Sequence, residues 1–182
     1  MKTVRTLAIL YLSTILFSCT TDKNKLINVI ASGEEKLLDS KMEIKDTSAA
    51  SSLRKNYILF ADTYVADSAS GTYLFRAADL SIGLNQPNEA VQLLDRIILK
   101  YPDHPKSASA LFYQAFIYDS YLHLTASAME KYRLFINKYP NDQMVPSASA
   151  TLLQLETGLS DEELVKSFQH KNDSLSAVGQ KN

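Results

Sequence analysis

The feature that most constrains the fold of this 182-residue chain is an internal repeat with a spacing of 38 residues. Residues 88–102 (NEAVQLLDRIILKYP) and 126–140 (ASAMEKYRLFINKYP) align without a gap, and both end in Lys-Tyr-Pro. A few residues after each ending comes Ser-Ala-Ser-Ala, and a weaker first copy ends at Tyr64, where Val65 replaces the proline. Periods of about 20–50 residues are typical of chains that stack one supersecondary unit.

The repeated segments have the apolar period of a helix. In residues 88–101 the apolar side chains recur at every third or fourth position, as on one face of a helix. Pro87 suits a first helical turn, where its missing N–H costs nothing, whereas Pro102 and Pro140 end their helices. The part of this face that we expect to be core consists of Leu94, Ile97, Ile98 and Tyr101.

The same pattern along the chain predicts an all-α fold of about eight helices, and no convincing period-2 strand is found. The predicted helices are 25–39, 48–65, 71–84, 87–101, 106–121, 125–139, 145–157 and 161–170. Gly33 is a weak spot in the first of them. Pro105 and Pro146 fit first helical turns, and Ser160 with Glu163 fits a capping box for the last helix.

The N-terminus has the pattern of a secretory signal. Lys2 and Arg5 give it a positive start, and residues 7–17 form an eleven-residue apolar run. This run is too short to span about 30 Å of hydrocarbon at about 1.5 Å per residue, but it has the length of a signal-peptide core. Cys19, the only cysteine of the chain, follows directly.

The tetrapeptide Leu16-Phe17-Ser18-Cys19 resembles a bacterial lipobox, with an aliphatic residue at −3 and a small residue at −1 of the modified cysteine. The resemblance implies that Cys19 carries acyl chains such as palmitate and holds the protein on a membrane. Thr20, rather than Asp, follows the cysteine, which favours the outer membrane by the sorting rule of enteric bacteria. The alternative is an ordinary secretory peptide with an incidental cysteine.

Composition and missing motifs exclude several function classes. One cysteine and three scattered histidines provide neither a disulfide nor the ligand set of a metal site. The net charge is −1, and 17 basic against 20 acidic residues remain without Lys2 and Arg5, so no basic footprint for nucleic acid exists. Phosphate loops and the common hydrolase motifs are absent. We therefore expect no enzyme, no cofactor, no metal and no small-molecule substrate, with His104 solvated in its loop.

The repeats resemble the tetratricopeptide repeat (TPR), a helix–turn–helix of about 34 residues. The motif's small, large, small-to-medium and proline positions are occupied by Ala90, Leu94, Ile97 and Pro102 counted from Gly71, and by Ala128, Tyr132, Phe135 and Pro140 counted from Ser109. At position 8, where Gly or Ala is usual, the first copy has Ala78 and the second departs with Phe116. The resemblance implies a TPR-like right-handed helical solenoid of helices in antiparallel pairs.

The TPR resemblance also implies a binding face. In such solenoids the first helix of each pair lines a concave groove that binds extended or helical peptides. Carried over position by position, the partner-binding groove is lined by Phe75, Asp79, Ile82, Tyr113, Ile117 and Tyr121. The alternative is that these residues pack against a neighbouring helix, including the N-terminal helix 25–39 folded into the groove.

The lipobox, the Tyr-Pro endings and the extended spacing together resemble the BamD/YfiO-type outer-membrane lipoproteins and the TPR domain of CpoB (YbgF), over about residues 50–157. This implies a lipid-anchored, periplasm-facing scaffold that binds envelope proteins, for example in outer-membrane protein assembly. A CpoB-like regulator of cell-wall synthesis or envelope constriction is the alternative. Residues 25–39 disfavour it, because they are too short for the sustained heptads of a coiled coil. An envelope enzyme with an unrecognised site is the third hypothesis.

These patterns divide the chain into four parts. We expect a signal peptide over 1–18, a lipidated cysteine with a polar tether over 19–25 and a helical repeat domain over 26–170. Residues 171–182 are polar and are predicted to be a disordered tail.

Overall fold

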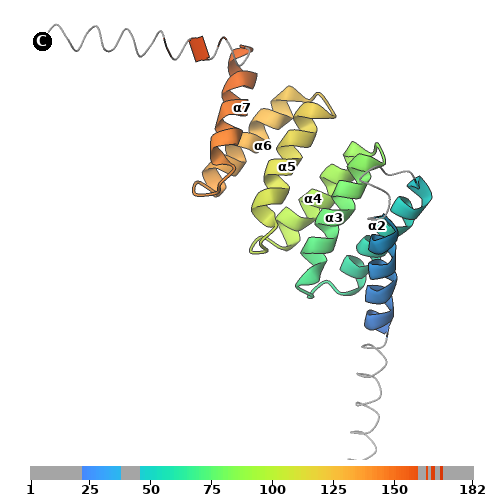
Figure 1. Ribbon diagram of the computed structural model, residues 1–182. Coiled ribbons are helices and arrows are strands. Elements are labelled where there is room, and N and C mark those ends of the chain that lie inside the picture. Colours follow the sequence, from blue (N-terminus) through green and yellow to red (C-terminus); the bar gives the residue numbers. More distant parts are fainter. Residues whose placement is uncertain (1–21, 38–45, 160–162, 164, 167–168, 170–182) are drawn as a thin grey trace, which may run out of the picture. The chain divides into compact units, whose positions relative to one another are not determined.

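The computed structural model describes residues 22–37, 46–159, 163, 165–166 and 169 (Figure 1). The predicted signal peptide 1–18, Cys19 and the tail 171–182 lie outside the described residues. So do Ser160, and with it the predicted capping box, and most of the predicted helix 161–170. The predictions for these segments therefore remain predictions.

The chain forms two compact units, divided between Lys106 and Ser107. Unit 1 contains helical residues 22–37 and the helices α2 (Thr47–Thr63), α3 (Ala69–Gly83) and α4 (Pro87–Lys100). Unit 2 contains α5 (Ser107–Ser120), α6 (Thr125–Lys138) and α7 (Val145–Thr157). In unit 1, α2 packs against α3, and α3 packs against α4. In unit 2, α5 packs against α6, and α6 packs against α7 (Figure 1). The predicted all-α, TPR-like class is confirmed, and the described residues contain no strand.

Helix boundaries lie within one or two residues of the predictions in most places. Pro87 and Pro146 stand in the first turns of α4 and α7, as predicted. Pro105 does not, because α5 begins only at Ser107. Residues 22–37 form one helix that is not interrupted at Gly33. There the absence of a side chain permits close packing: a Cβ on Gly33 would lie 3.0 Å from Leu53 Cδ1 of α2.

One turn geometry recurs three times, after α2, α4 and α6. The tyrosine that ends each helix donates its backbone N–H to the carbonyl oxygen four residues earlier, at 2.8 Å for Tyr64, 2.9 Å for Tyr101 and 2.9 Å for Tyr139. The third residue after the tyrosine accepts a backbone N–H with its side chain: Asp67 from Ala69 at 2.8 Å, His104 from Lys106 at 3.0 Å and Asp142 from Met144 at 2.9 Å. The turn after Tyr64 therefore has the same geometry as the other two, although it lacks the proline.

His104 is not solvated as predicted, since its ring packs on the start of α3. A Cβ added to Gly71 would lie 2.9 Å from His104 Cγ and Cδ2. Because His104 Nδ1 accepts the Lys106 N–H, the proton sits on Nε2, which donates to the Ser68 carbonyl oxygen at 3.0 Å. The ring thus joins the end of α4 to the beginning of α3.

Alanines fill the helix crossings of both units. The fully buried ones are Ala50, Ala77, Ala78 and Ala90 in unit 1 and Ala110, Ala115, Ala128 and Ala148 in unit 2. Of the predicted core face, Leu94 and Ile97 are fully buried, while Ile98 and Tyr101 are half-buried. Small side chains at these points permit close approach of the helices, and the large ones fill the space beside them.

A buried arginine links three helices of unit 1. Arg54 of α2 forms an ion pair with Glu89 of α4 at 2.9 Å. Its guanidinium also donates to Ser81 Oγ of α3 at 3.4 Å and to Gln86 Oε1 in the turn before α4. A buried charge is tolerated only when it is paired in this way.

Gly71→Ala is expected to lower the free energy of unfolding by about 1–3 kcal/mol, because the new Cβ collides with the His104 ring. In a His104→Ala background the same change is expected to raise it by up to about 1 kcal/mol, because alanine favours a helix more than glycine does. Urea denaturation of the wild type, both single variants and the double variant measures this reversal. An equal cost in both backgrounds would show that the ring is not the obstacle.

Candidate partner-binding site

The six residues predicted to line a groove lie in two units. Unit 1 carries Phe75, Asp79 and Ile82 on α3, and unit 2 carries Tyr113 and Ile117 on α5 and Tyr121 just after it. Their solvent exposure differs: some of these side chains lie at the surface, and others are buried.

In unit 2, three aromatic side chains gather at the surface. Tyr113 stacks on Phe116 with ring centroids 6.2 Å apart and an interplanar angle of 23°. Tyr121 meets the edge of Phe116 at 6.0 Å and 74°. Phe116 is 38% exposed and Tyr121 is 44% exposed. We call these three residues the α5 aromatic cluster.

Phe116 was not predicted as a binding residue, although its departure from the TPR pattern at position 8 was the available signal. Ala115, the residue before it, is fully buried, as are Ala77 and Ala78 at the two equivalent positions of α3. Phe116 itself is exposed and stacks on Tyr113. Ile117 requires a correction, because it is fully buried and belongs to the core rather than to a surface groove.

In unit 1, the predicted groove residues are less accessible. The Lys106 ammonium lies 5.1 Å from the centroid of the half-buried Phe75 ring, within the range of a cation–π contact. Ile82 is half-buried, and only Asp79 is exposed. Asp79 lines a cavity, which gives unit 1 a concave surface of its own.

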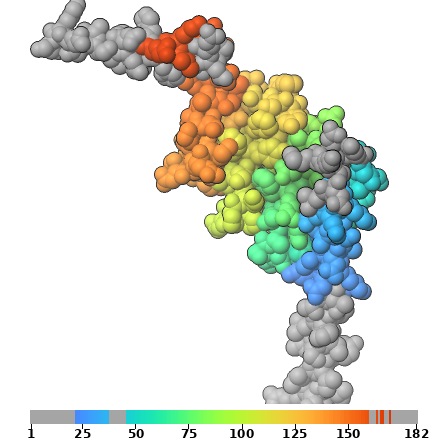
Figure 2. All heavy atoms as spheres, in the orientation of Figure 1, coloured from blue at the N-terminus to red at the C-terminus, as the bar shows by residue number. Residues whose placement is uncertain are grey.

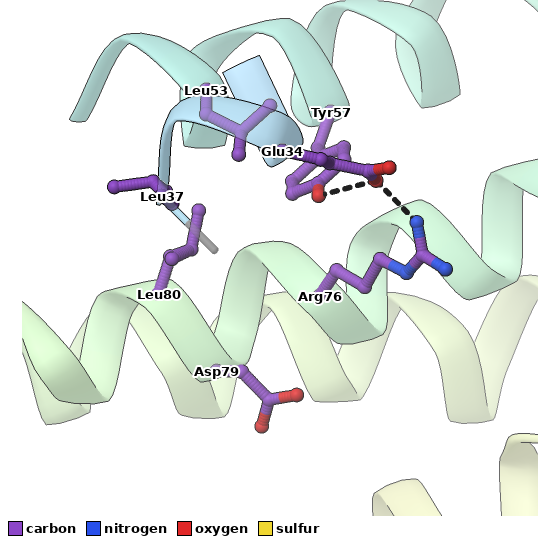
Figure 3. Close-up of a pocket in the computed structure, with 7 residues that line it drawn as sticks. All are labelled: Glu34, Leu37, Leu53, Tyr57, Arg76, Asp79 and Leu80. Carbon is purple, nitrogen blue, oxygen red and sulfur yellow. Dashed lines mark hydrogen bonds and ion pairs between the residues drawn. The ribbon is translucent and has the colours of Figure 1, made fainter. Parts of the chain in front are cut away.

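This cavity has a volume of about 330 Å³ and opens between residues 22–37, α2 and α3 (Figure 3). It is lined by Glu34, Leu37, Leu53, Tyr57, Arg76, Asp79 and Leu80. Glu34 Oε1 accepts a hydrogen bond from the Tyr57 hydroxyl at 2.7 Å and forms an ion pair with Arg76. Asp79 points away from these three groups (Figure 3). The N-terminal helix thus lies against α3, but through Arg76 rather than through the predicted residues.

Burial and a carboxylate shift the titration of the tyrosines beside this cavity. Burial, followed by the hydrogen bond and the charge of Glu34, raises the pKa of Tyr57 well above its usual value of 10. Tyr73 stacks on Tyr57 at 5.3 Å, and burial together with the Glu34 charge raises its pKa as well. The phenol of Tyr57 is therefore a hydrogen-bond donor throughout the physiological pH range.

The described residues contain neither a cluster of metal ligands nor a membrane-spanning helix. Residues 22–37 and 46–159 contain no group of three or more His, Cys, Asp or Glu placed to hold a metal ion. Within the same ranges, no helix has the length and apolar run required to cross a bilayer.

Residues 72–104 and 109–142 match the family model of the tetratricopeptide repeat. These two segments are similar to tetratricopeptide repeats. The two matches cover the helix pairs α3–α4 and α5–α6, each with the turn between its helices. A search of curated proteins found no relative. The repeats indicate a protein-interaction scaffold with protein partners, and the TPR fold is typically non-enzymatic.

Replacing Tyr57 with Phe is expected to flatten the loss of stability at alkaline pH. A pKa that is higher in the folded state means that the folded chain holds this proton more tightly. The contribution of Tyr57 to the free energy of unfolding is therefore fully present below about pH 10. Above this pH it falls, by at most about 1.4 kcal/mol per pH unit for one group. Urea unfolding between about pH 8 and about pH 11 measures the slope of the free energy of unfolding against pH. Equal slopes for the wild type and Tyr57→Phe would contradict the expected shift.

Proposed function

We propose that this protein is a lipid-anchored TPR scaffold that binds protein partners in the bacterial cell envelope, in a setting such as outer-membrane protein assembly. The observation that carries the binding role is the α5 aromatic cluster on a TPR helix pair. The lipobox pattern at Cys19 supports the anchor.

The α5 aromatic cluster has the physical properties of a binding hot spot. Aromatic rings provide large contact areas and are enriched among residues that dominate binding energy. Tyr113 and Tyr121 both contact Phe116, so the three rings hold one another in place before a partner arrives. Preorganised side chains lose less conformational entropy on binding. The cluster is therefore suited to an apolar or aromatic segment of a partner protein.

The N-terminal sequence supports a position close to a membrane. Only residues 20 and 21 separate Cys19 from Asp22, the first residue that the structure describes, which is helical. Three links of chain reach about 10 Å at most. An acylated Cys19 would therefore hold unit 1 next to the lipid surface, in the outer membrane and facing the periplasm.

The arrangement of the N-terminal helix favours the scaffold over a CpoB-like regulator. Such a regulator would use this region as a coiled coil, with its apolar side facing another helix of the same kind. Here Ile30 is buried within the chain, and Glu34 is paired with Arg76 of α3. The apolar side is thus used inside unit 1.

Cys19→Ala is expected to move the protein from the outer-membrane fraction to the soluble fraction, because the residue that carries the acyl chains is lost. Membrane fractionation, with metabolic labelling by a palmitate analogue, measures both effects. Thr20→Ala is the matched control, since it changes the neighbouring residue and keeps the cysteine. Soluble wild-type protein without label would contradict the anchor and leave a free TPR adaptor.

Tyr113→Ala combined with Tyr121→Ala is expected to weaken partner binding by at least about tenfold, because two hot-spot rings are removed. A photo-crosslinking residue at Ser120, between the two rings in sequence, identifies the partner in intact cells by mass spectrometry. Leu99→Ala is the control, since it truncates an apolar side chain that is 77% exposed on α4. Equal crosslinking in the double variant and the control would show that the cluster does not bind the partner.

A further inference from the structure

The N-terminal helix occupies a groove formed by neighbouring helices of unit 1. We define the α2–α3 groove by the side chains that residues 22–37 contact there: Leu53, Tyr57, Phe60, Tyr64, Asp67 and Arg76. We propose that this groove is a second protein-binding site, that residues 22–37 are its internal occupant, and that an amphipathic helix of a partner with the same order of charges competes for it. In Figure 2 the residues of this helix, in blue, lie directly against the green residues of α3.

At one end of the groove, the side chains surround the ammonium group of Lys23. Lys23 forms an ion pair with Asp67, and its ammonium lies 5.9 Å from the ring centroid of Phe60 and 5.8 Å from that of Tyr64. Tyr73 packs edge-on against the Phe60 ring, with the ring centroids 4.7 Å apart, and so holds Phe60 in place. A carboxylate and two aromatic faces together favour an ammonium or guanidinium group.

The other end of the groove binds a carboxylate. Glu34 accepts the Tyr57 hydroxyl at 2.7 Å and pairs with the Arg76 guanidinium. It follows Lys23 by eleven residues, which is about 16 Å along a helix. The residues that bind the Lys23 ammonium and those that bind the Glu34 carboxylate lie at opposite ends of the groove. The groove therefore accepts a helix in only one direction.

The middle of the groove selects for shape. Ile30 is the one residue of 22–37 that is fully buried, with 1% of its surface exposed. Gly33 faces Leu53, where an added Cβ would lie at 3.0 Å. A competing helix therefore needs a basic residue, an aliphatic residue seven positions later, a small residue three positions after that and then a carboxylate.

The packing of residues 22–37 is weak enough for exchange. Both charged contacts lie partly in solvent, where ion pairs contribute about 0–1 kcal/mol each. Cavities of about 330 Å³ and 580 Å³ border the helix, and Val29 is 53% exposed. A helix of this length has marginal stability on its own. Opening of this segment thus costs less than unfolding of the alanine-packed helices.

A peptide exchange experiment with reversed charges tests the proposal. The receptor is the full mature chain with Cys19→Ala, and the probe is a fluorescent peptide with the sequence of residues 22–37. Arg76→Glu in the chain repels its own Glu34, so a peptide carrying Glu34→Arg is expected to bind this chain at least about tenfold more tightly than the wild-type peptide does. Fluorescence anisotropy measures both affinities.

The control is Arg96→Glu, which disrupts the ion pair between Arg96 and Asp62 and leaves the groove charges intact. This chain is expected to show no preference for the Glu34→Arg peptide. Hydrogen exchange gives a second measure, since residues 22–37 are expected to exchange faster than α2 and α3 in the wild type.

The proposal is overturned if no chain binds either peptide and residues 22–37 exchange as slowly as α2. It is also overturned, in favour of exchange between copies, if Arg76→Glu and Glu34→Arg chains form a dimer only when they are mixed. Both results are independent of the Cys19 and Tyr113 experiments, so the groove and the envelope scaffold can fail separately.

Discussion

Close approach at alanine-lined helix crossings is the constraint on which the rest of this structure depends. Ala90 and Ala128 occupy equivalent points of α4 and α6, and both are fully buried. A larger side chain there would separate the helices of a pair and open a cavity beside each large core residue. Such residues include Leu94 and Tyr132, which are almost wholly buried in the same two helices. The spacing set by the alanines therefore determines which other positions reach the surface.

The α5 aromatic cluster contains a departure from the repeat pattern, Phe116 at a position that is usually Gly or Ala. Ala115 is fully buried, whereas the next residue, Phe116, is exposed and stacks with Tyr113. Ile117, which the repeat pattern places in the groove, is fully buried. An aromatic residue at a usually small position thus contributes to the exposed aromatic surface, together with Tyr113 and Tyr121.

Unit 1 contains contacts of two energetic kinds. The helices α2, α3 and α4 are joined through buried apolar groups and through Arg54, whose charge is paired inside the unit. Residues 22–37 are joined to α2 and α3 mainly through paired charges at the rim, with Ile30 as the buried anchor. Removal of buried apolar surface costs more than exchange of solvated ion pairs. The first set is therefore permanent, and the second is suited to competition.

The helical class, the repeat, most helix ends and the core positions Leu94 and Ile97 could be predicted from the sequence, because apolar period and proline act within one turn of the chain. It also contained the signal for Phe116, a large residue at a position that is usually small. Tertiary structure decided the contacts between residues far apart in sequence. His104 packs on Gly71, and Glu34 reaches Tyr57 and Arg76, because separate helices bring them together. No local pattern encodes such pairs, since each partner is compatible with many neighbours until the packing of alanines sets the distances.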